Sequence, residues 1–381
     1  MEFRGIKKQY EVLKLQIDNA IANVLAEGCF ISGPRIQELE RRLADYVGVK
    51  NCITCANGTD ALTLALMTWQ VGPGDVVFVP DFTFFASGET IAYAGATPIF
   101  VDVDASTYNM DPDKLERVIC QTEQEGKYCP KVVITVDLFG LPANYLRIRE
   151  ICERHHLLLL EDGAQGFGGS IQGKRACSFG DISTTSFFPA KPLGCYGDGG
   201  AVFTDNDEWA ALIRSYAVHG KGDMKYDNVR VGMNSRLDTL QAAILDVKLK
   251  AFREYEFEAA DQVSRWYDRL LVNSDLILPA RPNGFVSSWA QYTLQLPETI
   301  DRDALQAKLK EQGIPTIVYY PKPMHAQLAF AGTGSAKADC PVTERLCRTV
   351  LSLPIHPYLE NEECSQIAES MVKILQVLSH N

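Results

Sequence analysis

The chain has 381 residues, enough for two domains with a large core, and 46% of them are apolar, as in globular proteins. Its formal net charge of −11 excludes a broadly basic nucleic-acid-binding surface, although a local pocket for a phosphorylated ligand remains compatible. The sequence has no signal-peptide pattern, no apolar run approaching the roughly 18 residues that span a membrane, and scattered cysteines, so we expect a cytoplasmic protein with reduced thiols and no membrane partner.

The first 250 residues alternate short apolar runs with amphipathic stretches. A helix is predicted after Pro34, with apolar residues on one face, and Asp111 and Pro112 mark the start of another. The apolar runs occupy residues 76–79, 98–101, 132–136, 157–160 and 182–187. Because these runs are continuous rather than alternating, they are typical of strands covered on both faces. The pattern predicts an α/β protein with a mainly parallel sheet flanked by helices.

The pattern changes after about residue 250. A long charged helix is predicted over residues 249–271, and a later helix begins at Asp301 and ends near Gly313. Prolines punctuate the remaining segments. We therefore predict a large domain of residues 1–250 and a smaller C-terminal α+β domain of residues 251–381.

A glycine-containing turn, Asn57-Gly58-Thr59, lies between an apolar run at residues 52–56 and a helix-like stretch. Such a turn at a helix N-terminus presents free N–H groups and the positive end of the helix dipole, which favour a phosphate. Ser186, at the end of a later run, can add a hydroxyl group. Phe84 follows the run at 76–79 and can cover one face of a planar ring. An ordinary capped turn and a core aromatic remain the alternatives.

An acidic group and a lysine follow two successive apolar runs. Asp162 ends the run that begins at residue 157, where ligands of open α/β sheets bind, and Gln165 is close behind it. Lys191 follows the next run between two prolines, in a mostly uncharged segment that favours a neutral amine. A neutral amine attacks an aldehyde, and a carboxylate holds a pyridinium nitrogen in its protonated form. Separately, each residue has an ordinary interpretation as a helix cap or a surface lysine.

Several motifs resemble the DegT-like family of nucleotide-sugar aminotransferases. In chain order they are ANGTDAL, DFTFFAS, EDGAQGFG, SFFPAKPLGCYGDGGAVFT, NSRLDTLQAAIL and YYPKPMHAQ, followed by LSLPIHPYL near the C-terminus. The resemblance covers nearly the whole chain, and the lysine segment and NSRLDTLQAAIL are its most specific parts. It implies the aspartate aminotransferase fold (fold type I, with a seven-stranded type of sheet), pyridoxal 5'-phosphate (PLP) as the cofactor, and a homodimer with shared active sites.

The resemblance also implies roles for individual residues. Lys191 would form the Schiff base with PLP, Asp162 would pair with the ring nitrogen, and Gln165 would lie beside the ring hydroxyl. Phe84 would stack on the ring, while the phosphate would be held by Gly58, Thr59, Ser186 and, across the dimer interface, Asn234. Substrate binding would involve Arg236, Tyr320 and His325. The fork of Arg236 suits a carboxylate, whereas loop packing is an alternative for the other two.

The most similar phrases, SFFPAKPLGCYGDGGA and RVGMNSRLDTLQAAIL, resemble enzymes that aminate C3 of a UDP-linked 2-acetamido-3-oxo-glucuronate. Such a sugar is a precursor of bacterial surface polysaccharide or lipopolysaccharide, and glutamate is the expected donor. Amination at C4 of a 4-keto-6-deoxy sugar is the close alternative. A PLP-binding regulator without transaminase activity is another, although relatives of that kind usually lack the lysine.

The cysteines suggest two further hypotheses. Cys52 and Cys55 have the spacing of some zinc or redox motifs, but they lie in an apolar run without a second pair, so we interpret them as buried thiols. A cysteine desulfurase would need a mobile reactive thiol, for which Cys195 is the nearest candidate to Lys191 in the sequence. A neighbourhood of turn glycines does not by itself lower a thiol pKa, so we expect no metal site and no desulfurase.

Overall fold

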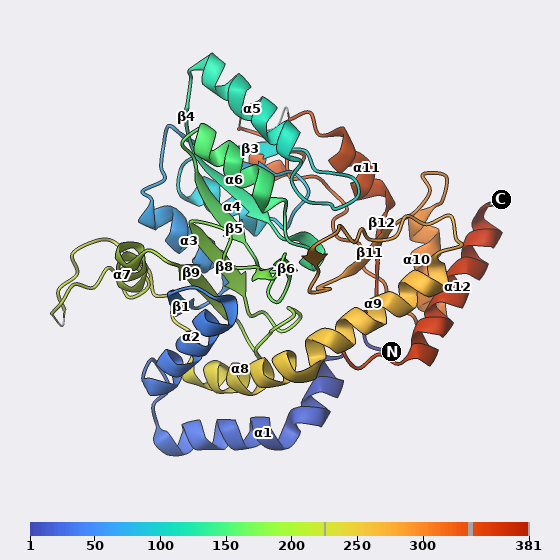
Figure 1. Ribbon diagram of the computed structural model, residues 1–381, viewed down its shortest axis with the longest axis horizontal. Helices are drawn as coiled ribbons and strands as arrows, with labels where there is room; N and C mark the ends of the chain where they lie inside the picture. The colour runs from blue at the N-terminus through green and yellow to red at the C-terminus, as the bar shows by residue number, and fades with distance from the viewer. Residues whose placement is uncertain (225, 334–337, 380–381) are drawn as a thin grey trace.

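The computed structural model describes residues 1–224, 226–333 and 338–379. A seven-stranded sheet forms its centre, in the order β1-β9-β8-β5-β4-β2-β3 (Figure 1). The strands are β1 (Asn51–Cys55), β2 (Asp75–Pro80), β3 (Thr97–Val101), β4 (Cys129–Val136), β5 (Leu158–Asp162), β8 (Ile182–Ser186) and β9 (Gly200–Thr204). Strands β3, β2, β4, β5 and β8 pair in parallel, whereas β9 is antiparallel to both of its neighbours. The predicted mainly parallel sheet is confirmed.

Helices cover both faces of this sheet, which explains the continuous apolar runs. In β2, Val77 and Val79 pack in the cluster that includes α3, whereas Val76 and Phe78 pack in the cluster that includes α5 and α6. Asp111 caps α5 by accepting hydrogen bonds from the amides of Asp113 and Lys114. The helices of this part are α1 (Ile6–Glu27), α2 (Pro34–Val47), α3 (Gly58–Thr68), α4 (Ala86–Tyr93), α5 (Pro112–Glu125), α6 (Tyr145–Arg154), α7 (Asp207–Tyr216) and α8 (Thr239–Ala251).

The C-terminal part has a second hydrophobic core, with Tyr267, Tyr292, Leu305, Leu353 and Met371 at its centre. It contains the two-stranded sheet of β11 (Tyr292–Gln295) and β12 (Val350–Leu353). Around it lie α9 (Phe257–Leu271), α10 (Arg302–Glu311) and α12 (Asn361–Ser379), whereas α11 (Pro341–Thr349) precedes β12 and packs in another cluster. Asp301 accepts a hydrogen bond from the amide of Ala304, and Gly313 follows α10 with a φ of 74°. We propose that the chain divides near residue 250 into the two predicted domains. Residues 334–337 and 380–381 of the second domain lie outside the described part.

The long helix begins earlier than the predicted residue 249. It starts at Thr239 as α8 and continues through a π-helical turn, Phe252–Glu256, into α9, as the yellow rod in Figure 1 shows. Ile244 contacts α1, while Leu245 packs in the core shared with α2. Because α8 is buried on several sides, it lacks the amphipathic pattern that signals a surface helix.

Short pairings complete the description. A three-stranded sheet joins β6 (Ser170–Ile171) and β7 (Lys174–Arg175) to β10 (Phe285–Val286), linking the large part to the segment after α9. In the described part of the chain, none of the helices combines the length and the apolar character needed to cross a lipid bilayer.

Candidate functional site

Asp162 is the last residue of β5 and is buried at the carboxyl end of the parallel strands. Its carboxylate accepts hydrogen bonds from Ser87 Oγ at 2.8 Å and from the amide of Ala164 at 3.2 Å. Burial raises the pKa of the Asp162 carboxyl, while the Ser87 hydroxyl and the positive charge of Lys191 act in the opposite direction. Both partners stabilise the anion that a pyridinium ring needs.

Lys191 lies in the loop between β8 and β9, on the same side of the sheet as Asp162. The loop is tight: the amide of Lys191 donates to Phe188 O at 2.9 Å, and a Cβ on Gly194 would lie 2.5 Å from the same oxygen. The pKa of Lys191 is lowered to about 8, chiefly by burial, while the charge of Asp162 raises it and that of Arg4 lowers it. The structure thus brings Lys191 and Asp162 together and increases the fraction of neutral amine compared with that of an ordinary lysine.

Gln165 is buried beside this pair and is fixed at both ends of its amide. Its Oε1 accepts from the amide of Phe139 at 2.7 Å, and its Nε2 donates to the hydroxyl of Tyr320 at 3.2 Å. The ring of Tyr320 lies 6.3 Å from that of Phe84, measured between centroids, and Phe84 is 55% exposed. Gln165, Tyr320 and Phe84 therefore meet at one location, as the sequence predicts, and Phe84 has a free surface for a ligand.

The predicted phosphate turn packs against the end of β8. Asn57 caps α3 by accepting a hydrogen bond from the amide of Asp60 at 2.7 Å. A Cβ on Gly58 would lie 2.8 Å from Ser186 Cβ, so only glycine allows this close approach between the turn and the strand. The first amides of α3 and the hydroxyl of Ser186 consequently lie side by side, in an arrangement suited to an anion.

The NSRL segment lies next to this turn within the same chain. Ser235 is buried, and its Oγ accepts a hydrogen bond from the amide of Ala56 at 3.0 Å. Asn234 is exposed, and its Oδ1 accepts a hydrogen bond from the guanidinium of Arg236. The hydrogen bonds and ion pairs of the described residues join neither Asn234 nor Arg236 to Lys191 or Asp162.

His325 is fixed by a residue that the sequence analysis did not identify, Asp81, which follows β2. Asp81 is fully buried and accepts from the amide of His325 at 2.8 Å, and its other oxygen lies 2.6 Å from Nδ1 of the same residue. Met324 donates its amide to the carbonyl oxygen of Asp81 at 3.0 Å. The ring of His325 is therefore engaged in holding its segment to the large sheet, while its role toward a substrate stays a prediction.

The thiols near the site have no features of reactive cysteines. Cys195 is buried, its Sγ contacts Phe187 O at 3.1 Å and Gly197 O at 3.2 Å, and burial raises its pKa to about 11. Cys52 and Cys55 are also buried, and burial raises the pKa of each. A thiol held in its protonated form is a poor nucleophile, so these contacts disfavour the desulfurase and redox interpretations.

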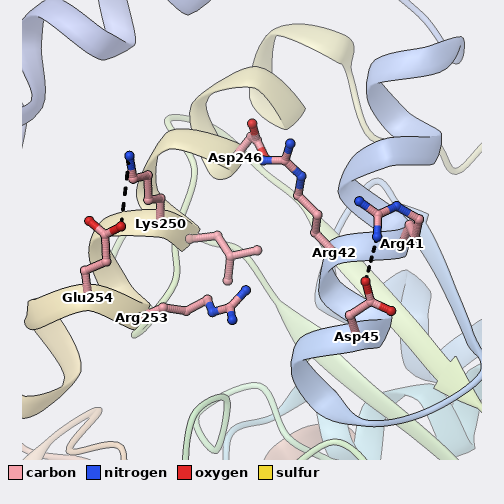
Figure 2. A pocket seen from close by; sticks show the side chains of 8 residues that line it. Arg41, Arg42, Asp45, Asp246, Lys250, Arg253 and Glu254 are labelled. Carbon is pink, nitrogen blue, oxygen red and sulfur yellow. Dashed lines mark hydrogen bonds and ion pairs between the residues drawn. The ribbon is translucent and has the colours of Figure 1, made fainter.

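A separate cavity of about 650 Å³ lies between α2 and α8, lined by Arg41, Arg42, Asp45, Asp246, Leu249, Lys250, Arg253 and Glu254 (Figure 2). Its charges are largely matched: Arg41 pairs with Asp45 at 2.8 Å and Arg42 with Asp246 at 2.7 Å. None of the predicted site residues lines this cavity. We assign the chemistry to the Lys191 region, where the predicted site residues converge, and not to this surface cavity.

Known proteins are similar to this chain over nearly its whole length. A model of the DegT/DnrJ/EryC1/StrS aminotransferase family matches residues 12–372. Over 371 residues the chain is 45% identical to the UDP-2-acetamido-2-deoxy-3-oxo-D-glucuronate aminotransferase of Pseudomonas aeruginosa, covering 97% of this chain and 99% of that protein.

Solved structures show the same relationship. A DegT DnrJ EryC1 StrS aminotransferase from Brucella abortus superposes with a TM-score of 0.95 and 46% identity, covering 98% of this chain and 99% of that one. NtdA from Bacillus subtilis, solved with bound cofactor PMP, gives a TM-score of 0.84 and 30% identity, covering 95% and 81% of the two chains.

Proposed function

The chain belongs to the DegT/DnrJ/EryC1/StrS aminotransferase family, and from this premise we propose that it uses PLP to transfer an amino group from glutamate to C3 of a UDP-linked 2-acetamido-3-oxo-glucuronate. The observation that carries the proposal is the juxtaposition of Lys191 and Asp162 at the carboxyl end of the sheet. The family relationship supports an aminotransferase, and the matched residues support the cofactor.

The described residues fit PLP, whose aminated form is PMP. Asp162 would face the ring nitrogen, Lys191 the aldehyde, and the first amides of α3 with Ser186 the phosphate. When bound, PLP supplies an electron sink for negative charge on the carbon next to the amino group. Among the predicted cofactor residues, Phe84 would cover the ring, and Gln165 would donate or accept at its edge, since its amide is already oriented by two hydrogen bonds.

The residues of the chain account for the proton transfers. Lys191, with a pKa lowered to about 8, can accept a proton from a substrate carbon and return one, and general catalysts are most effective with a pKa near the working pH. Burial raises the pKa of Asp162, but the Ser87 hydroxyl and the charge of Lys191 act against this effect and favour the anion that would face a protonated ring nitrogen. The first role is catalysis and the second is electrostatic stabilisation.

The choice of C3 rather than C4 is supported by the Pseudomonas aeruginosa relative, whose name specifies a 3-oxo-glucuronate. We propose that the product enters surface polysaccharide synthesis. With glutamate present, the purified protein is expected to increase the mass of the UDP-3-oxo-sugar by about one unit, because an amino group with its hydrogens replaces a carbonyl oxygen. Mass spectrometry of the nucleotide sugar detects this change.

The control reactions contain a UDP- or dTDP-4-keto-6-deoxy sugar, or omit glutamate. Turnover of the 4-keto sugar without turnover of the 3-oxo-uronate would contradict the proposed substrate and favour the C4 alternative. If neither sugar reacts while glutamate still converts the cofactor to its amino form, the enzyme class would be retained and the sugar assignment abandoned.

We further propose a homodimer in which Asn234 contacts the phosphate bound by the partner subunit. Exposed apolar side chains support an interface of this kind: Phe188 on the lysine loop is 51% exposed and Val231, near Asn234, is 89% exposed. The exposure of Asn234 supports this role, because an exposed side chain is available to a second copy.

Mixing two inactive variants tests the shared site. Lys191→Ala and Asn234→Asp chains, unfolded together and refolded in equal amounts, are expected to regain about a quarter of wild-type activity, because half the dimers are mixed and each has one intact site. Steady-state assays before and after mixing measure the recovery. Activity no greater than the average of the two separate variants would contradict the role of Asn234. A protein that is monomeric by analytical ultracentrifugation at a concentration at which it is active would exclude the dimer.

A further inference from the structure

Arg4 lies ahead of α1 and is held between segments of the C-terminal part. Its Nη1 donates hydrogen bonds to the carbonyl oxygens of Ala290 at 2.6 Å and Ile355 at 3.1 Å. Its neighbour Gly5 packs so tightly that an added Cβ would lie 2.5 Å from the ring of His356. Figure 1 shows the N-terminus beside α9 and α12. In the sequence, Arg4 is far from Lys191, which lies in the loop between β8 and β9. The side chain of Arg4 is thus fixed by the surrounding backbone.

A short series of contacts connects Arg4 to the active site. The residue after its first acceptor, Gln291, donates its amide to Phe139 O at 3.2 Å, and the amide of Phe139 donates to Gln165 Oε1 at 2.7 Å. The positive charge of Arg4 also lies close enough to lower the pKa of Lys191. Arg4 is therefore connected to Gln165 and lies within electrostatic range of Lys191, although it is distant from both in the sequence.

A second contact series reaches Gln165. The ring of Phe3 packs against that of Tyr319, with centroids 6.4 Å apart, and the next residue, Tyr320, accepts the hydrogen bond from Gln165. The N-terminal segment consequently packs against the residue next to Tyr320, which is a predicted substrate residue. Tyr319 also lies within electrostatic range of Arg4.

The charge of Arg4 is not compensated by the chain itself. Among the described residues no carboxylate forms an ion pair with Arg4, and its Nε is buried without a hydrogen-bond partner. Burial lowers the pKa of Arg4 to about 10. A partly buried cation without a matching anion is unfavourable, because buried charges are normally paired. The arrangement suits an anion that arrives as a ligand.

We propose that Arg4 binds a carboxylate of a substrate, offering Nε and the donors of Nη2 to its two oxygens. Arginine presents these donors in a planar fork that matches a carboxylate. The inference deepens the proposed function and rests on it, because both proposed substrates carry this group: the amino donor glutamate and the sugar acid. Arg236, predicted to bind a carboxylate, would serve the substrate that Arg4 does not.

Binding of two unreactive probes to the PLP-loaded protein tests the proposal. Glutarate represents the donor, and UDP-glucuronate, compared with UDP-glucose, represents the sugar acid. Replacing Arg4 with methionine is expected to weaken the binding of one probe by at least about 10-fold, because the variant cannot form a charged hydrogen bond to the carboxylate. Isothermal titration calorimetry measures both affinities. The matched control is Lys8→Gln, which removes an exposed positive charge from the same segment.

The two possible sources of the carboxylate, the amino donor and the sugar acid, predict different losses of probe affinity. Loss confined to glutarate, with a slower glutamate half-reaction followed by cofactor absorbance, identifies the donor; loss confined to UDP-glucuronate, with UDP-glucose unchanged, identifies the sugar acid. Arg4→Lys keeps the positive charge but lacks the planar fork of donors, so its affinity for the probe should be intermediate. This variant can be measured if Arg4→Met does not fold. Unchanged affinities for both probes in either folded variant would overturn the proposal.

The same measurements separate this inference from the proposed function. If the wild-type protein fails to aminate the 3-oxo-uronate but binds glutarate in an Arg4-dependent way, the sugar assignment fails and the carboxylate site remains. If transamination proceeds normally in Arg4→Met with unaltered KM values for both substrates, the carboxylate site fails and the proposed function remains.

Discussion

Replacing Lys191 with alanine is expected to lower transamination by about 10³-fold or more and to remove the visible absorbance of lysine-bound PLP near neutral pH. The side chain is the buried amine at this end of the sheet whose pKa of about 8 is set against a neighbouring carboxylate. Its removal eliminates both the covalent anchor and the group that transfers protons, and general acid–base catalysis alone contributes about 10²- to 10⁴-fold. Absorbance and borohydride fixation of the cofactor to the protein measure the effect.

A second buried lysine provides the matched control. Lys248 on α8 also has a pKa lowered to about 8 by burial, and its Nζ lies 4.8 Å from the ring centroid of Tyr196. Lys248→Met should keep the absorbance per folded molecule, because burial without the Asp162 pair does not create the site. In the wild-type protein, PLP uptake should accelerate as the pH rises through about 8, where Lys191 loses its proton. A borohydride-stable adduct in Lys191→Ala would contradict the assignment.

Much of the large sheet could be predicted because its strands are buried on both faces and their sequences are continuous apolar runs. The same rule fails where burial is equally complete in a helix. The segment Thr239–Lys248 lacks a polar face because α8 packs against both α1 and α2. The predicted start of this helix, residue 249, is therefore ten residues later than the observed start. The helix α1 was not predicted at all, since its exposed positions are not distributed in a strong amphipathic pattern.

The juxtaposition of Asp162 and Lys191 was predictable because Asp162 ends one strand, Lys191 follows the next, and parallel strands bring their carboxyl ends to one edge. Ser87 and Asp81 were missed, although they are the last and first residues of the DFTFFAS motif, because nothing in an isolated hydroxyl or carboxyl reveals its partner. Arg4 was missed for a different reason. Its position depends on the N-terminal segment packing against residues near 290 and 355, which no local pattern encodes.

Asp162→Asn is expected to lower turnover by about 10²- to 10³-fold while leaving PLP attached to the protein, because the amide keeps the size of the carboxyl but cannot stabilise a protonated ring nitrogen. Loss of one preorganised electrostatic contact has an effect of this order. The cofactor should still react with Lys191, although the pKa of Lys191 should fall further, since the charge of Asp162 raises it. Stopped-flow measurement of the glutamate half-reaction gives the rate, and a pH titration of absorbance gives the shift.

Ser87→Ala distinguishes the charge of Asp162 from its surroundings. This variant retains the carboxylate and removes a hydrogen bond of 2.8 Å, so the pKa of Asp162 should rise and the rate should fall by a smaller factor, about 10-fold, in keeping with one hydrogen bond to a charged group. The order wild type, Ser87→Ala, Asp162→Asn follows if the negative charge at this position drives the reaction. An Asp162→Asn rate equal to that of Ser87→Ala would mean that the carboxylate only shapes the pocket, and the ring nitrogen would then need another partner.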